Sequence, residues 1–335
     1  MRPQPQGFLG PTLETLSRPL DRIRRNCFRL FSPWLNPLFR NKSLRITVIA
    51  CVFLSVAFAM SMGLPCWQLA LGPILLGIPH LLGDIRFLVV RENLHKDSLF
   101  WLLVVTPLSL FLLLQSPAYG AGSILGATFL SKKSTVRHAV GLVAMALILL
   151  ALYNSRAFLY AVLHLHNVIA VAIWWGWNKK RQWWEGITLI VCCLFSMVIL
   201  FGPIDAFAIH NSHPDLLDPE YFQRTLAPFA AEHLQFRLVM LYAFLQSFHY
   251  LIWIKLIPEE SSKQPSPQSF KKSLRELHCD LGSYFLLLTG LCMLGLGAWA
   301  AFDIESARSN YLWLISFHGF LELAVCAHLV CRGAK

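Results

Sequence analysis

Several histidines of this chain lie inside stretches of sequence that are otherwise apolar. They are, in chain order, His80, His164, His166, His249 and His318. Two of them are followed four residues later by a carboxylate, Asp84 after His80 and Glu322 after His318. An ionisable side chain in hydrocarbon is costly and usually faces the interior of a helix bundle. The pattern therefore predicts the inner wall of a metal, haem or proton site.

Four of these histidines fall on four different apolar segments, so a helix bundle could bring them to one centre. Imidazole is the commonest metal ligand near neutral pH, and imidazole together with carboxylate suits non-haem iron, manganese or zinc. We therefore predict that His80, His164, His249 and His318 bind one metal ion in a bundle core. For each histidine taken alone, the alternative is an ordinary hydrogen bond between helices.

The two carboxylates and three further polar side chains are the predicted surroundings of this centre. Asp84 and Glu322 each share a helix face with the preceding histidine, so we expect them to orient it or to move protons during catalysis. His164 and the histidine two residues later point about 200° apart around a helix, so only one faces a given centre squarely. We assign supporting positions around the ligands to His166, Asn167 and Gln246.

The depth of the histidines leaves open whether they form one site or two. Counted along their apolar segments, His80 and His249 lie nearer the predicted cytoplasmic side, whereas His164 and His318 lie nearer the outer side. At a rise of 1.5 Å per residue the mismatch is roughly 9–10 Å. Helix tilt could remove this mismatch and give one metal site, whereas two levels would suit a pair of haems.

These residues need a membrane-spanning scaffold to position them. The chain has 335 residues, of which 56% are hydrophobic and 14% charged, whereas soluble proteins carry about 25% charged residues. Apolar runs of about 17–25 residues are typical of transmembrane helices. We predict an all-α, polytopic bundle of about ten spans, at residues 45–64, 66–86, 98–115, 118–131, 138–153, 157–177, 185–204, 235–256, 279–302 and 310–331.

The charges of the connecting segments predict how this bundle is oriented. Basic segments alternate with neutral or acidic ones along the ten predicted spans, as expected when basic loops stay in the cytoplasm. Both termini are then cytoplasmic, and removing the short span 118–131 would break the alternation. We divide the chain into an arm, residues 1–44, and a bundle, residues 45–331, with an outer loop at 205–234 and a cytoplasmic loop at 257–278. The Pro/Ser-rich part of the latter, 259–276, is typical of a flexible linker.

The remaining charged and cysteine-containing segments have simpler interpretations. The net charge of +11 does not indicate a nucleic-acid partner, because the basic residues flank the apolar runs. In the arm, LDRIRRNCFRLFSPWL predicts contact with an anionic membrane surface, with a free cytoplasmic tail as the alternative. His210 and His213 in the outer loop could cover a substrate entrance, bind a metal weakly, or belong to a solvated loop. The nine scattered cysteines contain no Cys-x-x-Cys pair, so we interpret them as small apolar residues.

The stretch GIPHLLGD, residues 77–84, resembles the hallmark Gly-x-Pro-His-Gly-x-x-Asp of the Brp/Blh family of bacterial membrane proteins. Members of this family are multi-pass, iron-dependent dioxygenases that cleave beta-carotene and use histidine ligands. Leu81 stands where the family has its second glycine. The resemblance implies that His80 is an iron ligand and Asp84 its neighbour. The run FLQSFHYLIW, 244–253, resembles the family's late histidine-rich helix; it keeps His249, but Trp253 replaces the second histidine.

Together these observations predict a membrane-embedded oxygenase or related oxidoreductase that depends on a metal, non-haem iron by the resemblance. Its substrate would be lipophilic, such as a carotenoid or lipid, and its location the bacterial inner membrane. Two alternatives from other classes remain. A haem-binding electron carrier would use pairs of the histidines as axial ligands, and a proton-coupled transporter would use the histidines and carboxylates as a relay. The oligomeric state is not predicted.

Overall fold

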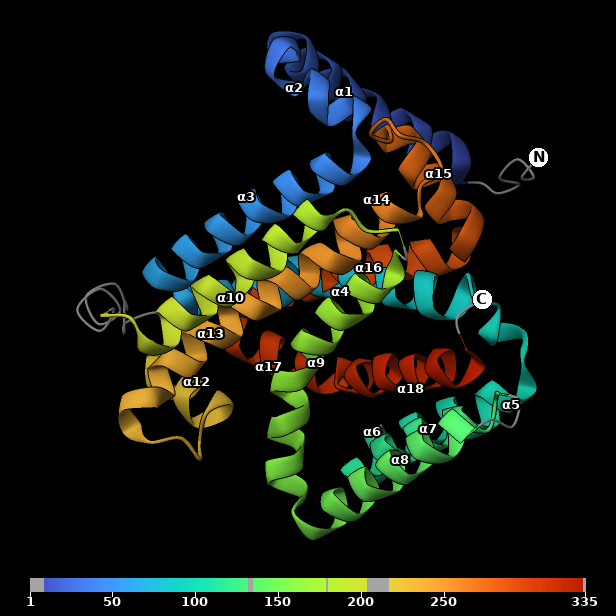
Figure 1. The fold of residues 1–335 in the computed structure, drawn as a ribbon, viewed down its shortest axis with the longest axis vertical. Helices are drawn as coiled ribbons and strands as arrows, with labels where there is room; N and C mark the ends of the chain where they lie inside the picture. Colours follow the sequence, from blue (N-terminus) through green and yellow to red (C-terminus); the bar gives the residue numbers. More distant parts are fainter. Residues whose placement is uncertain (1–8, 132–134, 179, 204–216, 334–335) are drawn as a thin grey trace.

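The computed structural model describes residues 9–131, 135–178, 180–203 and 217–333 (Figure 1). All regular secondary structure within these ranges is helical, which confirms the all-α fold class. Turns of π-helix continue α4 at Ile85–Val90 and α13 at Ile252–Leu256. The α-helices are α1 Leu9–Leu30, α2 Ser32–Arg40, α3 Lys42–Gly63, α4 Pro65–Asp84, α5 Ser98–Phe100, α6 Thr106–Leu114, α7 Pro117–Thr128, α8 Thr135–Tyr153, α9 Ser155–Trp177, α10 Gly186–Phe201, α12 Pro219–Leu226, α13 Glu232–Leu251, α14 Ile257–Ser261, α15 Phe270–Leu281, α16 Ser283–Phe302, α17 Ile304–Ile315 and α18 Phe317–Arg332.

The described residues include eight helical stretches that are long and apolar enough to cross a membrane. Large apolar side chains on their outer surfaces, such as Leu142 and Leu288, are exposed, as expected where lipid replaces water. These features are those of a multi-pass integral membrane protein. The eight stretches are Lys42–Gly63, Pro65–Val90, Thr135–Tyr153, Ser155–Trp177, Trp183–Phe201, Glu232–Ser261, Ser283–Phe302 and Ile304–Arg332.

The other two predicted spans, 98–115 and 118–131, correspond to shorter helices. The apolar helix Ser98–Leu114 is followed by α7, which has 12 residues and therefore a length of about 18 Å. The hydrocarbon layer is about 30 Å thick, so α7 alone is too short to cross it. Instead α7 packs between α6, α8 and α18 inside the bundle. The ten-span count and the orientation of the termini stay predictions.

Helix α13 is the centre of the bundle. It contacts α3, α4, α9, α10 and α12, and Figure 1 shows it running alongside α3 and α10. In the most apolar 18-residue segment of Glu232–Ser261, 72% of the residues are buried, whereas in the corresponding segment of α16 none are. A side chain on α13 therefore faces protein on nearly every side, whereas one on α16 largely faces lipid.

The basic arm and the predicted linker form one helical unit at the end of the bundle that carries α14. Helix α1 packs along α15 (Figure 1). The Asp21 carboxylate accepts hydrogen bonds from the backbone amides of Phe270 and Lys271, at 2.8 and 3.1 Å, and so caps the start of α15. The segment predicted to be a flexible linker is therefore helical from Phe270 onward.

The predicted outer loop, 205–234, contains a short helix, α12, which packs against α13. Asp218 caps this helix by accepting a hydrogen bond from the amide of Glu220 at 2.8 Å. The loop histidines His210 and His213 lie outside the residues that the structure describes, so their predicted roles stay open.

Candidate metal centre

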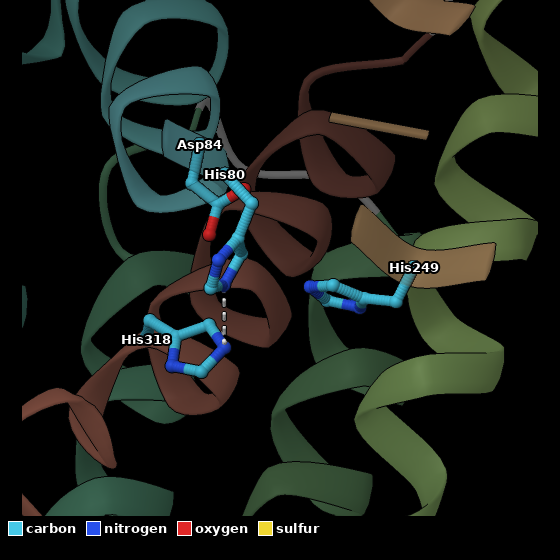
Figure 2. A group of neighbouring side chains, drawn as sticks. All are labelled: His80, Asp84, His249 and His318. Carbon is cyan, nitrogen blue, oxygen red and sulfur yellow. Dashed lines mark hydrogen bonds between the residues drawn. The ribbon is translucent and has the colours of Figure 1, made fainter. Parts of the chain in front are cut away.

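Three of the predicted ligand histidines meet in the middle of the bundle. His80 of α4, His249 of α13 and His318 of α18 point toward one another, with Asp84 beside them (Figure 2). Each of these four residues offers one ligand atom, and the four atoms all lie within 4.8 Å of one another. All four residues are buried, with His249 and Asp84 at 0% exposure. They form a group that could hold a metal ion.

A fourth imidazole, from His166 of α9, completes a ring. The distances between ring centroids are 5.2 Å for His80–His249, 5.0 Å for His249–His166, 5.3 Å for His166–His318 and 5.1 Å for His318–His80. The four sides of this ring are thus nearly equal. Four different helices each contribute one histidine, so the ring also ties α4, α9, α13 and α18 together.

Hydrogen bonds to the backbone orient three of the four imidazoles. The Nδ1 atoms of His80, His166 and His318 lie 3.2, 2.7 and 2.6 Å from carbonyl oxygens of the preceding turn of their own helices. A carbonyl can only accept, so each Nδ1 carries the proton and each Nε2 keeps its lone pair. Nε2 of His80 and Nε2 of His318 lie 3.5 Å apart. A metal ion shared by two imidazoles requires two lone pairs that face each other. The hydrogen bond that the outer nitrogen, Nδ1, donates to the backbone sets this tautomer. The accepting carbonyls belong to Leu76, Leu163 and Ile315.

Several polar atoms at this centre are buried and have no hydrogen-bond partner among the described residues. They are both carboxylate oxygens of Asp84, both ring nitrogens of His249 and Oε2 of Glu322. Buried polar groups are nearly always paired, and a buried charge without a partner costs several kcal/mol. A cation between the histidines and Asp84 would satisfy these atoms. The donor set of imidazoles with carboxylate therefore fits a transition metal.

Glu322 lies behind His249 and has a second contact of its own. Its Oε1 is 3.6 Å from Nε2 of His249, which is too long for a hydrogen bond, and it accepts one from the indole Nε1 of Trp253 at 2.8 Å. Trp253 and His249 are one turn apart on the α13 stretch. Trp253 thus anchors the carboxylate beside the imidazole.

Two close helix contacts bring these side chains together. A Cβ atom on Gly83 would lie 2.8 Å from the carbonyl oxygen of Trp253, so only glycine lets α4 approach the α13 stretch this closely. A Cβ on Gly319 would lie 3.3 Å from the Cβ of His166, so glycine also allows the tight approach of α18 to α9. Both glycines neighbour a residue of the cluster.

The histidines share one depth in the bundle because the helices extend beyond their apolar cores. The last stretch begins at Ile304 rather than at residue 310, so His318 lies at the midpoint of Ile304–Arg332. His166 lies at the midpoint of Ser155–Trp177, and His80 and His249 lie within three residues of the midpoints of their stretches. Three residues correspond to about 4.5 Å. The mismatch expected from the sequence disappears, and the structure has one cluster rather than two.

His164, predicted as the fourth ligand, is not part of this cluster. Its Nε2 donates a hydrogen bond to the carbonyl oxygen of Leu226 in α12, at 2.8 Å, and its ring packs against Tyr242 with ring centroids 5.2 Å apart. Because the two histidines of α9 point to opposite sides, His166 occupies the inner position. The sequence offered one signal for this choice, since His166 lies at the middle of its helical stretch.

The other two predicted supporting residues are also buried near the cluster. Asn167 is 1% exposed. Gln246 lies one turn before His249 on α13 and is 5% exposed. Its side chain lines a pocket beside the cluster.

This pocket has a volume of about 230 Å³ and is lined by three of the ring histidines, His80, His166 and His318. Its other walls are mainly apolar and come from α6, α9, α13, α17 and α18. They include Phe111, Leu159, Val162, Leu312, Ile315 and Phe320. Three of the ring imidazoles thus border a space that could hold a small ligand.

Comparison of this chain with protein-family models, curated proteins and solved structures finds no match. The site must therefore be interpreted from its own chemistry.

Proposed function

We propose that the chain is a membrane-embedded, metal-dependent oxygenase that acts on a lipophilic substrate, with non-haem iron held by His80, His166, His249 and His318. The observation that carries this proposal is the ring of four imidazoles, in which Nε2 of His80 and Nε2 of His318 lie 3.5 Å apart, beside a carboxylate that lacks a partner among the described residues. Sites rich in imidazole suit non-haem iron, and manganese and zinc prefer similar ligands.

The geometry of the ring favours a bare metal ion over haem. A haem between His249 and His318, whose centroids are 6.0 Å apart, would need its porphyrin plane to pass between them. His80 and His166 stand within 5.3 Å of both rings and occupy that plane. A haem could bind only if two of the four helices moved apart.

Iron at this site would supply the redox chemistry that dioxygen needs. Cleavage of a carbon–carbon double bond by one molecule of dioxygen gives two carbonyl groups, so it balances without a further reductant. The residues of the chain bind the metal, orient the histidines and exclude bulk water from the buried centre. Asp84 and Glu322 would offset the metal's positive charge, and the hydrogen bond that Trp253 donates holds Glu322 beside His249.

The pocket beside the ring is the proposed position of the substrate. Its apolar walls suit an acyl or polyene segment, and such a molecule can reach the bundle from the surrounding bilayer. The resemblance of residues 77–84 to the Brp/Blh family supports a carotenoid as one candidate and the bacterial inner membrane as the location. These two points rest on that resemblance alone.

The two histidines of α9 provide a matched test of this proposal. We expect purified His166→Ala protein to bind iron at least about 10-fold more weakly than the wild type, whereas His164→Ala protein keeps wild-type affinity. Metal titration of the two variants, with thermal stability measured in parallel, checks this expectation. Equal metal affinity in both variants, or loss only in His164→Ala, would contradict the assignment of the ring.

A further inference from the structure

Besides the ring histidines, one face of helix α13 brings three polar side chains to the pocket. Tyr242, Gln246 and Tyr250 follow one another at intervals of four residues on α13, and all three line the pocket. Residues four apart share a helix face. Polar groups therefore enter the pocket from α13, whereas α6, α9 and α17 contribute mostly hydrocarbon.

Gln246 is the notable member of this polar face. Its side chain is buried, and no hydrogen bond joins it to another residue in the part of the chain that the structure describes. The bundle satisfies a comparable amide fully: Gln68 accepts a hydrogen bond from Ser61 at 2.9 Å and donates one to Ser247 at 2.6 Å. The Gln246 amide differs from that of Gln68 because it borders the pocket.

An unsatisfied amide in such a pocket discriminates between ligands. A pure hydrocarbon would exclude water from Gln246 and offer no hydrogen bond in return. Leaving one buried donor or acceptor unpaired corresponds to roughly 5- to 150-fold in affinity. Sites built to hydrogen-bond a substrate oxygen reject the analogue that lacks it far more strongly than they reject a change of one methylene group.

We propose that the pocket binds a lipophilic chain that carries a hydroxyl or carbonyl oxygen, and that the Gln246 amide recognises this oxygen by hydrogen bonding. The inference rests on the proposed function and defines its substrate class. Gln246 lies three residues, or about 4.5 Å along the helix axis, from His249, so the recognised oxygen binds close to the metal rather than at the far end of the chain. Gln246 is a specificity-determining residue in this scheme.

The test compares a linear polyene alcohol with the polyene hydrocarbon of the same chain length. Binding to the full-length protein in lipid nanodiscs is followed by the absorbance of the polyene, and empty nanodiscs correct for partition into lipid. We expect the wild type to bind the alcohol at least about 10-fold more tightly. The variant Gln246→Met, which keeps the length of the side chain, should bind both ligands within about 2-fold. The matched control Gln235→Met, on the same helix, removes an amide that is bonded to Ala230 and lies outside the pocket.

The outcomes separate this inference from the proposed function. Equal binding of the two polyenes by the wild type, or binding of neither, would overturn the inference without any variant. A Gln246→Met protein that keeps the preference, or that loses its metal, would also overturn it, because the residue would then serve another purpose. Metal content is measured on the same samples. A wild type that prefers the alcohol but holds no metal would contradict the proposed function alone.

Discussion

Replacing Glu322 by glutamine tests how the buried carboxylates act on the metal centre. The change preserves the size of the side chain and its ability to accept the hydrogen bond that Trp253 donates at 2.8 Å. It removes the negative charge 3.6 Å from Nε2 of His249. If the carboxylate orients that imidazole and offsets the metal's charge, metal affinity should fall about 10–100-fold, or about 1.4–2.7 kcal/mol.

The same change has a predictable effect on stability. At a metal concentration of about 1,000 times the wild-type Kd, binding stabilises the fold by about 4.1 kcal/mol, and a 10–100-fold weaker site leaves about 2.7–1.4 kcal/mol. Without metal this difference disappears, because a carboxyl group buried away from water is neutral, and glutamine replaces it with a neutral group of the same size. Glu322→Gln should therefore unfold at nearly the same temperature as the wild type when both are metal-free, and gain less from added metal.

Metal titration and thermal unfolding in detergent, each with and without metal, measure both effects. Glu305→Gln is the control, since this carboxylate lies in the same helical stretch but is exposed. A role limited to an interhelical hydrogen bond predicts only a loss of about 0.6 kcal/mol. Unchanged metal affinity in Glu322→Gln would refute the reasoning, whatever happens to stability.

Two further predictions concern the membrane orientation and the helix contacts. On a cysteine-free background, Glu220→Cys should react with an impermeant thiol reagent from outside the cell and Ser266→Cys only from the cytoplasm; reaction of both from one side would contradict the predicted orientation. Gly77→Ala should cost about 1–3 kcal/mol, because its Cβ would lie 2.3 Å from the Tyr311 hydroxyl. Gly72→Ala, whose nearest contact would be 3.4 Å, should leave the unfolding temperature nearly unchanged.

The cost of a polar group in hydrocarbon made much of the cluster predictable. His80, His249 and His318 are isolated polar residues on apolar segments, so each had to face the interior, and the structure brings them together. The choice between His164 and His166 was not predictable in the same way. Both belong to one amphipathic pattern, and the face of α9 that turns inward is set by its contacts with α13 and α18.

The single depth of the cluster depends on interactions that hydropathy does not report. Charged residues near residue 308 make the start of the last stretch look polar. In the structure Arg308 is buried and its Nε donates a hydrogen bond to the carbonyl oxygen of Leu69 at 2.8 Å, so the helix runs on to Ile304. Similarly, Glu259 is buried against Arg45 at 2.5 Å, which lets the α13 stretch continue beyond its apolar core.

The helix α15 shows that local amino-acid composition does not always predict secondary structure. The proline and serine content of 259–276 is typical of a linker, yet the second half of this segment is helical. The Ser269 hydroxyl caps the helix by accepting a hydrogen bond from the backbone amide of Lys272 at 3.2 Å. The carboxylate of Asp21, in the distant arm, accepts hydrogen bonds from two further backbone amides. A contact between residues about 250 positions apart cannot be read from local composition.

The most direct test of the central claim is the metal content of the purified wild-type protein, measured by elemental analysis together with its absorbance spectrum. The proposed site predicts roughly one transition-metal ion, iron if the resemblance holds, per chain, with no Soret band. The double variant His80→Ala, His249→Ala should then contain almost none. Full metal content in that variant, or a wild type that binds no metal even after reconstitution, would contradict the claim, and a strong Soret band would show that the cofactor is haem.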